Sequence, residues 1–475
     1  MKQIRHRTGA VTEMEQTTAK KNKYEIDMCN GTIMDKLISF SLPLMLSGIL
    51  QLMFNAVDII VVGRFSGSQA LAAVGSTSAL INVFTNLFIG ISLGANVLTA
   101  RFYAAGREKE VSETVHTAIT LALVSGIVMA LVGLAFSRGA LALMGTPDDV
   151  IGLSALYMRI YFLGMPFFML YNYGAAILRA VGDTKRPLLF LMIAGVINAC
   201  LNMVLVIVFK LGVAGVAIAT VISQMISCVL VLRCLCRSES SYRLRFSELG
   251  MKGYYLKQIF SVGVPAGIQS TVINFSNVLL QSSVNSFGST AMAGYTAANN
   301  LLGFLYVSVN SITQACMSFT SQNYGVGKLK RMDRVLADCM ILSVVVAVVL
   351  GCICYGFGPE ILQIYTEDAE VIACGMEILA YTTITYFLCG WMDLFPGALR
   401  GMGYSAVPMV LSVIGTVGTR VVWIFGIFPY HRSLAILFIS YPASWIITIV
   451  LQVICFYFVR RRVHRRSQAL AGQEA

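Results

Sequence analysis

The chain of 475 residues is 57% hydrophobic and only 12% charged, and its formal net charge is +12 at pH 7. Soluble domains carry about 25% charged residues, and a soluble protein of this length could not bury so much apolar surface. The composition therefore excludes an assembly of soluble domains. It predicts a polytopic membrane protein whose basic loops face an anionic cytoplasmic leaflet and not nucleic acid.

Apolar runs long enough to cross a bilayer, about 20 residues each, follow one another along the whole chain. Twelve such runs predict an all-α membrane protein with twelve transmembrane helices. The runs near residues 80 and 300 are the weakest because they are rich in Ser, Thr and Asn. The expected spans are 37–63, 72–100, 114–137, 150–179, 187–209, 212–235, 257–286, 291–321, 335–357, 371–399, 406–429 and 434–459.

Polar segments divide these spans into two halves. A cytoplasmic linker at 236–256 separates an N-lobe at 37–235 from a C-lobe at 257–459, and tails are expected at 1–36 and 460–475. With both termini on one side, that side collects 29 of the 35 Lys and Arg residues, including Arg400 after span ten, and the other side holds four. The bias predicts a multi-pass protein of the cell (inner or plasma) membrane with both termini in the cytoplasm.

The two halves repeat one another at a spacing of 221 residues. A constant spacing that persists through several helices is hard to obtain by chance. Each half has six spans, so both enter the membrane from the same side, and a pseudo-two-fold axis along the membrane normal should relate them. The matched residues include Gly67 with Gly288, Gly182 with Gly403, and Pro187 with Pro408.

Three tracts resemble the multidrug and toxic-compound extrusion (MATE) family of transporters. The tract 178–187, LRAVGDTKRP, is similar to the loop between helices four and five of that family, and 399–408 echoes it. The segment 55–63, NAVDIIVVG, looks like the family's aspartate-bearing segment. The resemblance covers about residues 33–459. It implies two six-helix lobes in a V with a cavity between them, and a transporter that is not an enzyme.

Asp58 is the first candidate functional residue, because an ionisable group inside a span costs about 2.5–3.5 kcal/mol at the bilayer centre. It lies about 9 Å inside the outer end of its helix, and Asn202 and Thr220 lie at a similar depth of about 12 Å. Asn198 is one helical turn from Asn202, on the same face. Alternatively, Asp58 pairs with Arg64 or reaches the interface, and the other polar residues only bond between helices.

Carboxylate, amide and hydroxyl oxygens together could hold Na⁺, whereas Asp58 alone could bind a proton. No other metal site is expected. The resemblance implies that Asp58, Asn198, Asn202 and Thr220 match the cation site of one MATE branch. That branch has a second acid where this chain has Asn202. The missing charge favours H⁺ over Na⁺.

In the C-lobe, Asp393 and Arg420 are expected at similar depths in spans ten and eleven. Facing each other they would be tolerable in the membrane, either as a structural ion pair or as charges on a cavity wall that exchange partners during transport. Asn172, within an aromatic and methionine-rich tract at 165–173, is a further candidate for the substrate cavity.

These features predict a monomeric antiporter that exports amphiphilic cationic compounds in exchange for H⁺ or Na⁺. No cofactor or ATP is expected, since the segment 325–328 lacks the Walker spacing, and the partners are small organic substrates and membrane lipids. The alternative is a flippase or exporter of a lipid-linked or other metabolite precursor, which a strongly basic cavity would favour. A receptor or scaffold would need a soluble domain that the short tails do not supply.

Overall fold

The computed structural model describes residues 24–471, and within this range the chain is helical and has no β-strand. Helices suit an apolar chain because each backbone N–H and C=O group is satisfied within the segment. Residues 1–23 and 472–475 of the expected tails lie outside the described range. The first half comprises α2 (Met34–Phe65), α3 (Ser68–Ala104), α4 (Glu108–Leu143), α5 (Asp148–Leu163), α6 (Met165–Ala180), α7 (Lys185–Asn202), the π-helix η1 (Met203–Val208) and α8 (Gly212–Cys236).

The second half repeats the order of the long helices and adds several short ones. Its last helix continues through most of the segment expected to be a basic tail. The elements are η2 (Phe246–Glu248), α9 (Gly253–Asn285), α10 (Ser289–Gly325), α11 (Leu329–Gly356), α12 (Gly358–Gln363), α13 (Ala369–Thr382), α14 (Tyr386–Gly401), α15 (Ala406–Ser412), the π-helix η3 (Val413–Gly418), α16 (Thr419–Val422), the π-helix η4 (Trp423–Ile427) and α17 (Leu434–Ala471).

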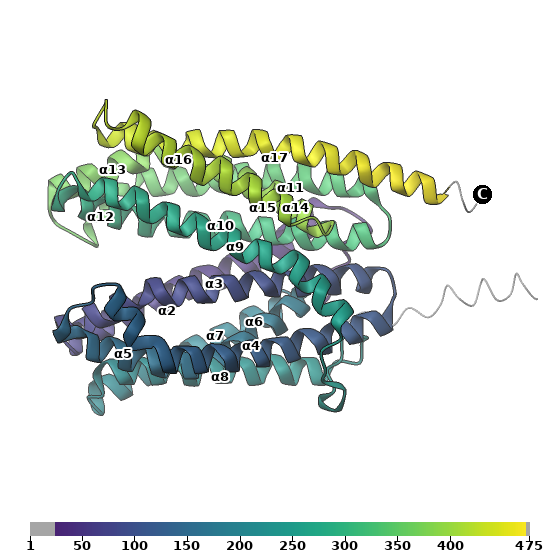
Figure 1. Cartoon of the computed structure of the whole chain (residues 1–475), viewed down its shortest axis with the longest axis horizontal. Coiled ribbons are helices and arrows are strands. Elements are labelled where there is room, and N and C mark those ends of the chain that lie inside the picture. Colours follow the sequence, from purple (N-terminus) through teal and green to yellow (C-terminus); the bar gives the residue numbers. More distant parts are fainter. Residues whose placement is uncertain (1–23, 472–475) are drawn as a thin grey trace, which may run out of the picture.

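The helices form two bundles, one of α2–α8 and one of α9–α17, hereafter the N-lobe and the C-lobe (Figure 1). In residues 24–471, eight helical segments are long and apolar enough to cross a membrane, and two bent pairs, α5 with α6 and α13 with α14, make ten. The long helices α9 and α10 complete a twelve-span layout but are more polar. The span near residue 300 is therefore weak as expected, whereas the weakness of α9 was not expected.

The two bent spans lie at matching positions of the lobes. The axes of α5 and α6 differ by 47°, and those of α13 and α14 by 51°. In the N-lobe, Pro166 follows the break, and its ring removes a backbone donor from the ladder. A Cβ on Gly126 of α4 would lie only 2.5 Å from the Pro166 Cα atom, so the helix α4 packs closely at the bend.

The lobes contact each other through their first helices. The first half of each first helix packs against the opposite lobe. In Figure 1, α9 runs obliquely from the N-lobe to the C-lobe. Its first half packs on α3, where a Cβ on Gly90 would lie 2.3 Å from the Gly267 Cα atom. Likewise, α2 packs on α10, where a Cβ on Gly48 would lie 2.0 Å from Val307 Cγ1. Small residues thus allow close helix contact at one end of the molecule.

The segment that precedes α2 contacts both lobes at this joined end. Glu25 accepts hydrogen bonds from the hydroxyl groups of Tyr103 in α3 and Tyr242 in the linker after α8, each at 2.7 Å. From the C-lobe, Lys328 Nζ donates to the Cys29 carbonyl at 3.0 Å, and further bonds come from Arg331. The segment therefore ties the two lobes together where they are already in contact.

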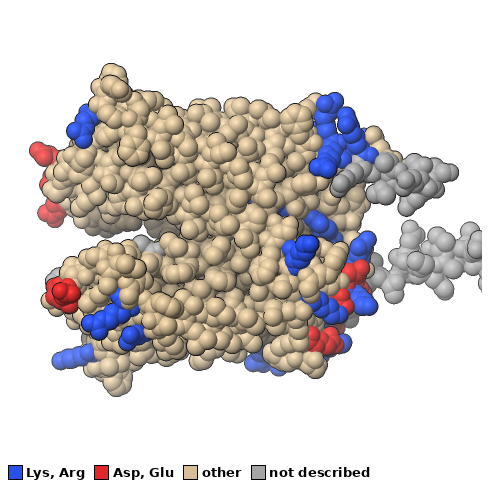
Figure 2. Space-filling view, in the orientation of Figure 1, with Lys and Arg blue, Asp and Glu red and all other residues tan. Residues whose placement is uncertain are grey.

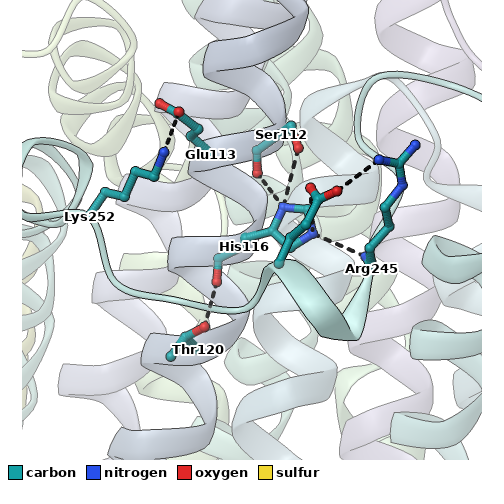
Figure 3. Close-up of polar contacts among 7 residues, drawn as sticks. Ser112, Glu113, His116, Thr120, Arg245 and Lys252 are labelled. Atoms are coloured by element: carbon teal, nitrogen blue, oxygen red, sulfur yellow. Dashed lines mark hydrogen bonds and ion pairs between the residues drawn. The ribbon is translucent and has the colours of Figure 1, made fainter.

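The linker between α8 and α9 docks on α4 through a histidine (Figure 3). The Arg245 backbone N–H donates to His116 Nε2 at 3.0 Å, and His116 Nδ1 lies 2.7 Å from the Ser112 carbonyl oxygen. Since the carbonyl can only accept, Nδ1 is the donor in this second bond. Lys252 pairs with Glu113 at the end of the linker. The linker is thus fixed to the N-lobe.

Charge and shape differ between the two ends of the molecule (Figure 2). Lys and Arg residues gather at the end where α2 begins and α17 ends, and a hollow separates the lobes at the opposite end. The lobes are therefore closed against each other at the basic end and apart at the other.

Candidate functional site

Asp58 is half-buried in α2 and faces α7 and α8. Its Oδ1 atom accepts a hydrogen bond from Asn202 Nδ2, and its Oδ2 atom lies 3.5 Å from Thr220 Oγ1. Asn202 Nδ2 is also 3.2 Å from Asn198 Oδ1. The structure therefore brings together all four residues selected from sequence depth. Among residues 24–471 no ion pair joins Asp58 to Arg64, which is exposed.

The protons at this site are unevenly distributed. Thr220 has one hydroxyl proton, and its nearer acceptor is the Val216 carbonyl at 3.0 Å, so its lone pairs can face Asp58 Oδ2. The Asn202 side chain is fully buried, and its Oδ1 atom has no hydrogen-bond partner within the described chain. Asp58 therefore has one oxygen, Oδ1, that already accepts a hydrogen bond from Asn202, and a second, Oδ2, that can take up a proton.

A cavity of about 490 Å³ lies on the C-lobe side of the space between the lobes. It is formed by α9, α10, α13, α14, α16 and α17, with one wall from α3 of the N-lobe. The polar side chains of α9 and α10 face it, which explains why these two spans are less apolar than the others. Its lining includes Asp393, Arg400, Arg420, the amides Asn86, Gln269, Asn274, Asn277, Asn299, Asn310 and Gln314, and the rings Tyr295, Tyr306, Tyr386, Tyr441 and Trp445.

Asp393 and Arg420 both line this cavity, but the expected ion pair between them is wrong. Arg420 Nη1 donates to Asn277 Oδ1 at 2.7 Å, and its guanidinium lies 4.7 Å from the centre of the Tyr441 ring. Within the described part of the chain, no Lys, Arg or His forms an ion pair with Asp393. Depth was estimated for a regular helix, but the π-helix Val413–Gly418 precedes Arg420 and holds an extra residue that turns the side chains after it.

Arg400 is a cavity residue that the sequence reasoning missed, because it was counted with the cytoplasmic charges. Its side chain is 9% exposed, and its Nη2 atom donates to Gln269 Oε1 of α9 at 2.7 Å. A signal was available in the sequence. Arg400 follows Asp393 by seven residues, about two helical turns, so the two side chains lie on one face of α14.

Asn172 is not among the residues that line this cavity. Its Nδ2 atom donates to the Phe168 carbonyl at 2.8 Å, within its own helix α6. The cavity belongs to the C-lobe, and α6 packs instead against α3, α4 and α8 of the N-lobe. In residues 24–471 no group of three or more His, Cys, Asp or Glu could hold a metal ion.

Comparison with known families and proteins agrees with this architecture. The MatE family model matches residues 43–204 and 265–425, once in each lobe. The "Probable multidrug resistance protein YoeA" of Bacillus subtilis (strain 168) is 32% identical over 434 residues, which cover 89% of this chain and 93% of the relative. The "Multidrug export protein MepA" of Staphylococcus aureus (strain NCTC 8325 / PS 47) is 22% identical over 382 residues, or 80% and 84% of the two chains.

Solved structures share the fold at low sequence identity. The "Outward-facing conformation of a multidrug resistance MATE family transporter of the MOP superfamily" matches with a TM-score of 0.85 and 19% identity, over 94% of this chain and 100% of the other. The structure described as "Reverse polarity of binding pocket suggests different function of a MOP superfamily transporter from Pyrococcus furiosus Vc1 (DSM3638)" matches with a TM-score of 0.84 and 19% identity. The match covers 94% of this chain and 99% of the other. The two matches to the family model and the 32% identity show that the chain belongs to the MATE family of membrane transporters and is not an enzyme.

Proposed function

We propose that the chain is a proton-coupled antiporter of the cell membrane that exports amphiphilic organic compounds by alternating access between its two lobes. The relatives named above are multidrug resistance and export proteins, which supports an organic cargo. The bias of 29 basic residues to four supports cytoplasmic termini. In that orientation the lobes are closed at the cytoplasmic side, and the hollow between them opens to the outside.

The observation that carries the proposal is Asp58. Its carboxylate lies within a membrane-spanning helix, its partners Asn202 and Thr220 are neutral, and no cation forms an ion pair with it in the described chain. A carboxylate without a counter-charge is costly in the membrane, and binding of a proton or a monovalent cation removes that cost. Loading and release of a cation at Asp58 would therefore change the energy of the site, as coupling requires.

The position of α2 supplies a path from this site to the joint between the lobes. The outer half of α2 carries Asp58 in the N-lobe, whereas Leu37, Phe40 and Leu44 of its first half are buried in the C-lobe core. Pro43 lies within this first half and removes one backbone hydrogen bond from the helix. A change in the bonding of Asp58 would therefore act on a helix that both lobes hold.

A proton fits the donors and acceptors at this site better than sodium does. Na⁺ is a hard cation that requires several oxygen ligands. Asn202 presents its Nδ2 donor to Asp58, and this amide occupies the position where a second acid would add a ligand. A protonated Asp58 could instead donate to Thr220 Oγ1, because the Thr220 hydroxyl can donate to the nearer Val216 carbonyl.

The test uses the purified full-length chain in liposomes loaded with a panel of fluorescent amphiphiles. We expect efflux when a pH gradient is imposed in sodium-free buffer, and loss of that efflux when a protonophore collapses the gradient. Strict dependence on a sodium gradient would contradict proton coupling and favour Na⁺ at Asp58. Absence of efflux with either gradient would contradict the antiport.

A second candidate is the flipping or export of a lipid-linked or other anionic precursor. It is favoured by Arg400 and Arg420, which line a cavity with only one acid, Asp393. This arrangement also does not favour the positive charge expected of the cargo. Transfer of short-chain fluorescent lipids between leaflets, without efflux of water-soluble dyes, would support this candidate over the first.

A further inference from the structure

We infer that the C-lobe cavity binds an acidic group of the transported amphiphile, a carboxylate, sulfonate or phosphate, through Arg400 and Arg420. The inference deepens the proposed export function by naming its substrate class, and it rests on that function only in taking the ligand to be cargo.

The first argument is the balance of charge in the cavity. Arg400 is 9% exposed and Arg420 is 3% exposed, and neither forms an ion pair with any acid in residues 24–471. Buried cations in membrane proteins are normally paired, because an unpaired charge of low exposure is costly. The lining has two guanidinium groups and one carboxylate, Asp393. An anionic ligand would supply the missing negative charge.

The second argument is that both guanidinium groups are held in place but keep free donors. Arg420 donates from Nη1 to Asn277 and Ser276 and from Nε to Ser444, whereas its Nη2 atom makes no hydrogen bond in the described chain. Arg400 donates from Nη2 to Gln269, and its buried Nε has no partner.

A guanidinium has five N–H donors, and charge-assisted bonds from such donors to carboxylate or phosphate are strong and directional. All the protein acceptors named above are neutral, so they orient the two arginines without neutralising them. Side chains fixed in this way lose little further freedom when a ligand binds, which favours affinity.

The third argument is the apolar wall beside these donors. Tyr295 and Tyr441 join through their hydroxyl groups at 3.0 Å, and the rings of Tyr386 and Trp445 pack edge to face at 5.6 Å. The cavity volume of about 490 Å³ is that of a pocket for a drug-sized molecule. The cavity therefore fits a ligand with one acidic head and an aromatic or aliphatic body.

The experiment measures binding to the full-length protein in an uncharged detergent. Two dansyl amides with the same alkyl tail serve as probes, one ending in a carboxylate and the other in a trimethylammonium group, and binding is followed by fluorescence polarisation. We expect wild-type protein to prefer the carboxylate probe by about tenfold or more, the effect of one hydrogen bond to a charged group. No preference, or preference for the ammonium probe, would overturn the inference.

Variants show which side chains carry the preference. Arg420→Gln and Arg400→Gln should each reduce it by about tenfold, while Arg420→Lys keeps the charge and should retain part of it. Arg179→Gln is the matched control, because Arg179 is 221 residues before Arg400 in the repeat and does not line the cavity. An unchanged preference in the cavity variants, with monodisperse protein on gel filtration, would overturn the inference. Asp393→Asn should strengthen binding of the carboxylate probe.

Two further measurements are needed. The first distinguishes a lipid headgroup from a free amphiphile as the source of the acidic group, and the second distinguishes failure of the binding inference from failure of the proposed transport function. Displacement of the carboxylate probe by phosphatidylglycerol, but not by phosphatidylcholine, would support the same chemistry with a lipid headgroup as its source. Displacement only by soluble aryl carboxylates would support it with a free amphiphile. If the carboxylate probe binds but no gradient drives its efflux, the proposed transport function fails and the binding inference stands.

Discussion

The N-lobe and the C-lobe repeat one topology, but they carry their acidic side chains at different positions of the repeat. Asp58 of α2 corresponds to Leu280 of α9 at the spacing of 222 residues that relates the first helices, and Leu280 is a buried core residue. Conversely, Asp393 corresponds to Asn172 at the spacing of 221. Each lobe therefore has an acid where the other has a neutral side chain.

The clearest contrast is at the fifth helix of each lobe. Asn198 of α7 is part of the Asp58 cluster, and a spacing of 221 would match it to Thr419. The π-helix Val413–Gly418 adds one residue before that point, so Arg420 takes the equivalent place. The amide of Asn198, which contributes an acceptor to the Asp58 site in the N-lobe, is thus replaced by the guanidinium of Arg420 in the C-lobe. The difference supports a division in which the N-lobe handles the coupling ion and the C-lobe handles the cargo.

The substitution Asp58→Asn tests most directly whether the N-lobe handles the coupling ion. We expect coupled efflux from liposomes to fall by about 100-fold or more, because the amide has a similar shape but cannot take up a proton. Protein yield should be nearly unchanged. Asp35→Asn, at the exposed start of the same helix, is the control and should transport normally. Wild-type efflux by the Asp58 variant would place coupling elsewhere, with Asp393 as the next candidate.

The converse change, Asn202→Asp, restores a second acid beside Asp58. We expect sodium to stimulate efflux by about tenfold in this variant relative to its effect on wild type, because a carboxylate adds a charged oxygen ligand in place of the Nδ2 donor. Efflux is measured at fixed pH with sodium or choline outside the liposomes. If sodium has the same effect on both proteins, the identity of residue 202 does not select the ion.

The two contacts that join the lobes should differ in their tolerance of an added methyl group. Gly90→Ala places Cβ against the Gly267 backbone, which cannot move aside, and should destabilise the fold by roughly 1–3 kcal/mol. Gly48→Ala meets the Val307 side chain, which can change rotamer, and should cost about half as much. Thermal unfolding in detergent gives the order, and Gly75→Ala, with no neighbour within 4 Å, is the control.

The smallest expected effect is the coupling between Asp393 and Arg420. Because they form no ion pair, the stability changes of Asp393→Asn and Arg420→Gln should add to within about 0.5 kcal/mol in a double-mutant cycle without ligand. The cycle is measured by thermal unfolding of the two single variants and the double variant. A larger interaction energy would show that the two side chains interact directly, and Arg420 would then not be an unpaired cation of the cavity.

Composition and residue spacing were enough to predict the membrane class, the twelve spans, the repeat and the cluster at Asp58. Composition indicates whether lipid or water surrounds a chain. In a helix, the fixed rise of about 1.5 Å per residue converts residue number into depth in the membrane. Asn202 and Thr220 could be matched to Asp58 in this way, and the structure places both against its carboxylate.

The direction in which each side chain faces, and the lobe that forms the cavity, could not be predicted before the packing of the helices was known. Depth says nothing of rotation about the helix axis, and the π-helix before Arg420 changes that rotation without changing the apolar pattern. Arg420 therefore bonds to Asn277 on α9 and not to Asp393. Arg400 is buried because α9 extends onto the other lobe and brings Gln269 to meet it, a contact between residues 131 positions apart that no local pattern records.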